Sequence, residues 1–188
     1  VVLMLDLTPS ESFVHANDVK VIDGSVLVAG RIGPQAVIWM VSLGGVVSAP
    51  VPIAGTGDIE PLEANALNND GDVVGQAWVG SVQNGFLYDG AEMTDLGSLA
   101  NFGSYASGIN DNDVVVGTCT NHVQGPNFDY YAFVWEDGTM YDLFHQVSDR
   151  TSSRIDDACD VNDNGDIVGN GAMKNRNNWK FHGFLARP

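Results

Sequence analysis

One short pattern recurs along this chain and constrains its fold more than any other feature. It begins with Ala, passes through an Asn/Asp/Gly turn and aliphatic residues, and ends with Gly. Clear copies span residues 64–75, 106–117 and 158–169, and a degraded copy with extra residues spans 16–30. Such self-similarity indicates a repeat protein, in which each unit buries its apolar face against its neighbours. The 188 residues are enough to bury a sizeable core.

Each copy predicts a β-hairpin followed by further strands. Asp70-Gly71 and Asn164-Gly165 stand between apolar segments, which is the strongest short-range signal for a hairpin. Asn112-Asp113 replace them in the third copy, since Asn and Asp tolerate positive φ. Third strands are expected at 36–39, 85–88, 132–135 and 183–186, and fourth strands at 93–96 and 140–143.

The ends of the chain complement each other. The repeats, at about 11–53, 61–97, 104–143 and 155–186, make one domain over 1–188, and the last repeat has no fourth strand of its own. Its missing Met-x-Asp-Leu pattern occurs at residues 4–7. We therefore expect residues 1–7 to complete the last unit and close an all-β, four-bladed β-propeller of four-stranded antiparallel blades. The alternative fold is a β-sandwich or a β-solenoid of the same hairpins.

Two features favour blades over a sandwich. Residues 114–116 and 133–135 are continuously apolar, which predicts strands covered on both faces. The Ala that opens each copy falls on the first strand, where a narrow axis requires small side chains. Insertions gather in the connections after the second strand and between repeats, which predicts that one face of the array carries the binding loops.

The repeat resembles a known family. The pattern Ala-x-x-Ile-Asn-x-x-Gly-x-Val-Val-Gly, followed by His-Ala-Phe-Leu-Trp-x-x-Gly-x-Met-x-Asp-Leu-Gly, is similar to the HAF extracellular repeat. Its pieces here are 106–117 with 132–143, 64–75 with 86–97, and His182-Gly183-Phe184-Leu185. The chain departs from the family pattern in three ways. Its first copy is degraded, repeats one to three lack the family's His, and repeats three and four carry long insertions. The resemblance implies a secreted or cell-surface location and a shared scaffold, but no activity, because the family has no established one.

The charge of the chain excludes several partners. Its 8 basic and 24 acidic residues give a net charge of −16. Binding to nucleic acid is therefore not expected, because phosphate contacts need clustered Lys and Arg. No apolar run reaches the roughly 18 residues of a membrane span, so no transmembrane segment is expected.

Two insertions carry most of the candidate binding residues, and Arg154 lies in the connection between repeats three and four. Aromatic rings beside amides and cations suit either a glycan or a protein interface. The candidate ligand-binding residues are Asn127, Asp129, Tyr130, Arg154, Arg176 and Trp179. No catalytic residue and no metal ligand is assigned.

The sequence leaves open whether the chain binds calcium and whether its two cysteines form a disulfide. The turns at 68–72 and 162–166 look like fragments of a calcium loop, but they lack its distal Glu, and hairpin chemistry explains them without a cofactor. No cofactor other than calcium is suggested by the sequence. Cys119 and Cys159 fall on neighbouring repeats, so a disulfide between them is compatible with the expected fold.

Enzyme signatures are missing from the sequence. It contains no Gly-x-Ser-x-Gly, no phosphate-binding glycine loop and no His-Glu-x-x-His. Asp156-Asp157, near Arg154, leaves a polysaccharide hydrolase as the weakest hypothesis. We expect a non-catalytic binding or structural module for a glycan or a protein. The alternative is a homo-oligomer or filament formed by exchange of the N-terminal strand.

Overall fold

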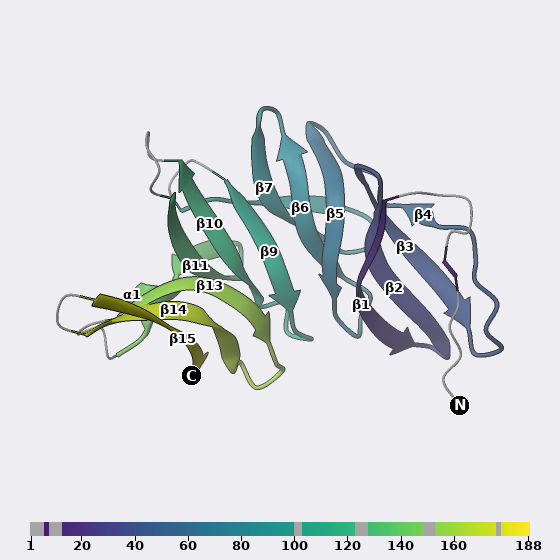
Figure 1. Cartoon of the computed structure of the whole chain (residues 1–188). Coiled ribbons are helices and arrows are strands. Elements are labelled where there is room, and N and C mark those ends of the chain that lie inside the picture. The colour runs from purple at the N-terminus through teal and green to yellow at the C-terminus, as the bar shows by residue number, and fades with distance from the viewer. Residues whose placement is uncertain (1–5, 8–12, 100–102, 123–127, 149–152, 176–177) are drawn as a thin grey trace.

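The computed structural model describes residues 6–7, 13–99, 103–122, 128–148, 153–175 and 178–188. These residues form four antiparallel sheets in chain order, one for each repeat (Figure 1). The all-β class is therefore confirmed, and the described residues form four sheets where a sandwich has two.

The strands follow one another within each sheet. Sheet 1 contains β1 (Val14–Ile22), β2 (Ser25–Ile32), β3 (Gln35–Ser42) and β4 (Val51–Pro52). Sheet 2 contains β5 (Ile59–Leu67), β6 (Val73–Val79), β7 (Val82–Tyr88) and β8 (Met93–Gly97). Sheet 3 contains β9 (Ser104–Ile109), β10 (Val115–His122), β11 (Phe128–Glu136) and β12 (Thr139–Asp142), followed by the single-turn helix α1 (Leu143–Gln146). Sheet 4 contains β13 (Ser153–Val161), β14 (Ile167–Asn175) and β15 (Asn178–Ala186).

An asparagine side chain shapes the hairpin turn of repeats two, three and four. In repeat three, Asn110 Oδ1 accepts hydrogen bonds from the backbone amides of Asn112 and Val114, both at 3.0 Å. Asn68 and Asn162 make the same two bonds in their own turns. Asp113 takes φ 58°, as the sequence predicts for a turn without glycine. The recurring Asn is thus a turn cap that pairs amides the strands leave unpaired.

Three apolar cores lie between consecutive sheets. Ala64, Phe86 and Leu67 of sheet 2 pack against sheet 1, and Phe133 of sheet 3 occupies the same place against sheet 2. Ile155 and other apolar residues of sheet 4 pack against sheet 3. Strands covered on both faces explain the continuous apolar segments of the sequence.

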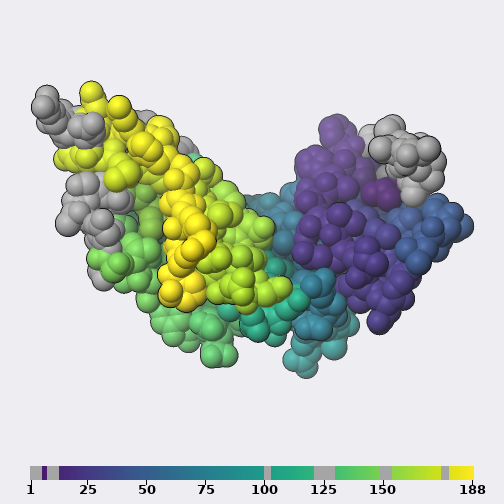
Figure 2. Space-filling view, turned by 90° about the horizontal axis from the view of Figure 1, so that it is seen from below, coloured from purple at the N-terminus to yellow at the C-terminus, as the bar shows by residue number. Residues whose placement is uncertain are grey.

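The sheets form an open array. Each packs on the next, whereas no strand of sheet 1 packs extensively against sheet 4 in the described part of the chain. Figure 2 shows the N-terminal strands (purple) and the C-terminal strands (yellow) on opposite sides of a wide hollow. Sheet 4 has three strands among the described residues. Residues 1–5, expected to complete it, lie outside that description, and Asp6 and Leu7 belong to no strand.

No helix in the described ranges has the length and hydrophobicity of a membrane-spanning segment. The helix α1 has four residues and is capped by Asp142, whose side chain accepts the amide of Phe144 at 2.9 Å.

Candidate functional site

A groove lined by aromatic rings opens between sheets 2 and 3, and we call it the aromatic groove. It has a volume of about 550 Å³. Its rings and its main polar groups come from Trp78, Tyr105, Tyr130, Gln76, Gln83 and Thr120. It lies beside the connections between second and third strands, on the face where the sequence predicts binding loops.

Strand geometry places two of these rings at the ends of hairpins. Trp78 is paired with Gln83 next to the tight β6–β7 turn, and Tyr130 is paired with Thr120 near the end of β10. The two rings are 38% and 39% exposed, so each is anchored on a strand but offers part of its surface to a ligand. Rigid aromatic groups of this kind contribute large contact areas at little entropic cost.

Tyr105 forms the half-buried inner part of the groove. Burial raises the pKa of its phenol above the usual 10, and the hydrogen bond with Thr118 opposes this effect. The phenol therefore stays protonated at physiological pH.

The aromatic groove is electrically neutral. None of the described residues that line it carries a charge, although the chain has a net charge of −16. Amides, hydroxyls and ring faces are its only recognition groups. This composition favours a neutral, hydroxyl-rich ligand over an ion.

A second cluster on sheet 4 contains two residues predicted from sequence. Arg154 on β13 and Lys174 on β14 place their charged groups 5.8 and 6.0 Å from the ring centre of Trp179 on β15. Both are within the range of cation–π attraction. Trp179 is 52% exposed, and Arg154 also forms an ion pair with Asp156. We call Arg154, Lys174 and Trp179 the cationic cluster.

The structure thus divides the predicted site. Tyr130 lies in the aromatic groove, whereas Arg154 and Trp179 lie together in the cationic cluster. Asn127 and Arg176 lie outside the described residues, as does the side chain of Asp129, whose backbone pairs with Asn121.

The sequence analysis missed Trp78 and Tyr105. They stand on regular strands and not in the insertions. The signal that could have found them is the alternation Gln76-x-Trp78, which puts an amide and an indole on one face of β6.

Asp156 and Asp157 are both engaged in local interactions. Asp156 pairs with Arg154, and Asp157 accepts a 2.6 Å hydrogen bond from the hydroxyl of Thr118. Two acids of a glycosidase instead face each other across a substrate cleft. The geometry therefore gives the hydrolase hypothesis no support from this pair.

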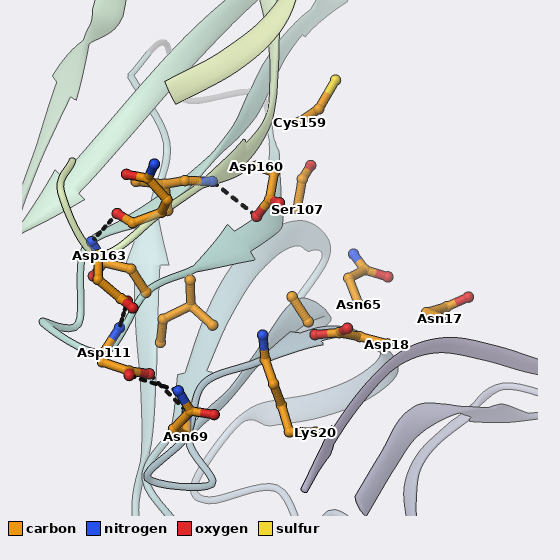
Figure 3. A pocket seen from close by; sticks show the side chains of 15 residues that line it. Asn17, Asp18, Lys20, Asn65, Asn69, Ser107, Asp111, Cys159, Asp160 and Asp163 are labelled. Carbon is orange, nitrogen blue, oxygen red and sulfur yellow. Dashed lines mark hydrogen bonds between the residues drawn. The ribbon is translucent and has the colours of Figure 1, made fainter. Parts of the chain in front are cut away.

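A polar hollow of about 440 Å³ lies where the first strands of the four sheets converge (Figure 3). The residue after each repeat's Ala lines it: Asn17, Asn65, Ser107 and Cys159. The side-chain amide of Asn17 donates to Ala64 O at 3.0 Å, and that of Asn65 donates to Ala106 O at 2.7 Å. These bonds join one sheet to the next, so the amides of this hollow have a structural role.

The turns that resemble fragments of a calcium loop form hydrogen bonds between amide and carboxylate groups. Asn69 donates its backbone and side-chain amides to Asp111, at 2.8 and 2.7 Å, and these bonds lower the pKa of that carboxyl. In the described ranges, no group of three or more His, Cys, Asp or Glu side chains is arranged to hold a metal ion. Within the two turns themselves, Asp72 accepts a hydrogen bond from the side-chain amide of Asn68 at 3.0 Å, and Asp166 accepts one from that of Asn162 at 3.2 Å.

In comparisons with known proteins, no family model matches the chain. No curated protein matches it either. The similarity to HAF repeats therefore stays a prediction, and the chemistry of the aromatic groove is the basis for a functional proposal.

The disulfide considered possible between Cys119 and Cys159 is not formed, and both cysteines are free. Cys119 is buried toward sheet 2, where its Sγ lies 3.5 Å from the amide of Leu99 and 3.6 Å from Met140 Sδ. Cys159 is exposed and lines the polar hollow. The two residues are on neighbouring sheets, but their side chains point to different places.

Thiol labelling tests this arrangement. Desolvation and the neighbouring Asp157 carboxylate raise the pKa of Cys159 to about 11. Because the thiolate is the reactive form and only ~0.1% of Cys159 is ionised at pH 8, labelling is slow there, and its rate rises about tenfold per pH unit up to that pKa. We expect iodoacetamide to modify one cysteine in the folded chain and two in urea, measured by mass spectrometry. If neither residue is labelled in urea without reductant, the two cysteines form a disulfide and the arrangement described here is wrong.

Proposed function

We propose that the protein is a secreted or cell-surface, non-catalytic module that binds neutral glycans through the aromatic groove. The observation that carries the proposal is an uncharged groove with three aromatic rings in a strongly acidic chain. Sugar rings present C–H faces, which pack on aromatic rings, and hydroxyls, which bond to amides and hydroxyl groups. Trp78 and Tyr130 supply the rings, and Gln76 and Gln83 supply the amides.

The proposal includes the architecture expected from the sequence, a four-bladed β-propeller of HAF-type repeats. Three features support it: the sheets follow in chain order, their first strands line one hollow, and Ala64, Ala106 and Ala158 are fully buried on those strands. A complete ring requires one more contact, between sheets 1 and 4. The extracellular location rests on the resemblance to the repeat family.

A protein ligand is the second candidate, and the cationic cluster favours it. An exposed Trp beside Arg and Lys has the composition of a protein-interface hot spot. Since this cluster and the aromatic groove lie on different sheets, substitutions can separate the two functions.

The glycan proposal is tested by measuring binding of the full chain to arrayed neutral and acidic glycans. We expect Trp78→Ala to weaken neutral-glycan binding about thirtyfold, the effect of a hot-spot residue worth ~2 kcal/mol. Tyr130→Ala weakens it in the same direction. Binding should change little with salt, because a neutral ligand makes no ion pair.

Trp179→Ala is the matched control, since it removes an exposed Trp outside the groove. We expect it to leave neutral-glycan binding unchanged. Loss of binding in Trp179→Ala alone would move the site to the cationic cluster. Binding restricted to acidic glycans would contradict the proposed ligand class.

A further inference from the structure

A largely apolar groove lies between sheet 3, α1 and the C-terminal end of β15, and we call it the edge groove. Its volume is about 1100 Å³. Val134, Leu143 and Val147 line it from sheet 3 and α1, and Leu185, Ala186 and Pro188 line it from the C-terminal segment. β15 is the last strand of its sheet among the described residues, so this edge presents backbone groups that a further strand can pair with.

Sheets 2 and 3 show what occupies the position beside the third strand. There the third strand pairs with a fourth strand, β8 or β12, of the pattern Met-x-Asp-Leu. Met93 stands opposite Tyr88, and Met140 opposite Trp135. The first and last residues of the pattern turn inward, as the buried Met93 and Leu96 show.

The methionines of β8 and β12 each belong to an apolar core that also contains an aliphatic residue from the end of the preceding sheet. Met93 shares an apolar core with Ile53 of the segment after β4. Met140 packs against the core that contains Leu96 of β8. Leu143, which follows β12, is the next residue of this series, and it lines the edge groove. The edge groove is therefore the place of a fourth strand and its methionine.

The chain contains one further segment of this pattern, Met4-Leu5-Asp6-Leu7. It leads into β1, and sheet 1 lies across the hollow from sheet 4 (Figures 1 and 2). Asp6 and Leu7 are described and belong to no strand. Pairing within one chain would require the segment to cross that hollow, whereas a neighbouring molecule can present it directly.

We propose that the edge groove receives residues 4–7 of a second copy of this chain as the fourth strand of sheet 4. The strand runs antiparallel to β15. By the register of β7 with β8, Met4 lies opposite Ala186, Leu5 opposite Leu185 and Asp6 opposite Phe184. Main-chain hydrogen bonds supply affinity, and the methionine pocket supplies specificity. The contact is head-to-tail, so it produces either closed rings or filaments.

Cross-linking between copies tests the source of the strand. Leu5→Cys and Leu185→Cys are introduced into separate full-length chains that also carry Cys159→Ser, and the chains are mixed and oxidised. We expect a disulfide-linked dimer containing one chain of each kind, identified by mass spectrometry of the joined peptides. When both substitutions are in one chain, a cross-linked monomer without dimers would show closure within the molecule and overturn the proposal.

Self-association measured by light scattering over a range of concentrations provides a second test. Met4→Asp places a charge in the methionine pocket and should weaken association at least about tenfold, as expected for losing a buried Met. Leu5→Thr is the matched control, since the equivalent residue of β8 is the exposed Thr94. It should leave association unchanged. Circular dichroism checks that both variants remain folded.

A chain that stays monomeric at every concentration and gives no cross-link would overturn the proposal. Equal association of Met4→Asp and Leu5→Thr would do the same. These outcomes are independent of glycan binding, since the two groove variants, Trp78→Ala and Tyr130→Ala, lie in sheets 2 and 3.

Discussion

The substitution Gly117→Ala is expected to destabilise the chain by about 3 kcal/mol or more, the upper part of the range for overpacked cores. A Cβ at this position would lie 2.1 Å from the carbonyl oxygen of Tyr105 and 2.9 Å from the ring of Phe133. The nearest atom belongs to the backbone of β9, so relief requires the strand to move. Urea unfolding followed by circular dichroism measures the effect as a fall in the midpoint.

Gly44→Ala is the matched control. A Cβ there has only Ser42 Oγ within 4 Å, at 3.7 Å. We expect a change within ~0.5 kcal/mol, as for surface substitutions in general. Equal effects of the two substitutions would show that the close approach at Gly117 is not a constraint on the fold.

The same close approach explains why each copy of the repeat ends in Gly. At Gly30, Gly75 and Gly169 an added Cβ would also lie about 2 Å from a carbonyl oxygen of the first strand, at 2.0, 1.9 and 2.0 Å. An aromatic ring of the third strand covers each position. The motif's glycine is thus required by the space between a strand and a ring.

The local structure could be predicted from the sequence because its determinants are local. Turn residues and apolar runs predicted the hairpins at Asp70-Gly71 and Asn164-Gly165, and each expected third strand lies within β3, β7, β11 or β15. Short-range patterns determine such features whatever the angle between neighbouring sheets.

The relations between sheets could not be predicted in the same way. Whether sheets 1 and 4 meet depends on small angles at three apolar interfaces, which no short pattern encodes. Trp78 and Tyr105 meet only because β6 packs beside β9. The state of the cysteines was left open for a related reason: the sequence placed them on adjacent sheets but did not give the direction of the Cys119 side chain.

The substitution Asn110→Ala is expected to remove about 3 kcal/mol, because it breaks a turn cap and a link between sheets at a buried position. Asn110 is 3% exposed. Its Oδ1 accepts the amides of Asn112 and Val114, and its Nδ2 donates to Asn162 O in sheet 4 at 2.9 Å. Truncation to Ala removes the hydrogen bonds of this side chain to all three backbone groups.

The substitution Asn162→Ala separates the effect of the turn cap from that of the hydrogen bond between sheets. Asn162 is exposed, it caps its own turn in the same way, and its Nδ2 donates to Asp166 of that turn at 3.2 Å. Its loss should cost about 1 kcal/mol, the value of a side-chain cap. We expect hydrogen exchange to accelerate across β13 and β14 in Asn110→Ala and only near the turn in Asn162→Ala. Equal losses of stability would mean that the amide of Asn110 contributes nothing to holding sheet 4 on sheet 3, and the rigidity of the array would then have to come from its apolar cores alone.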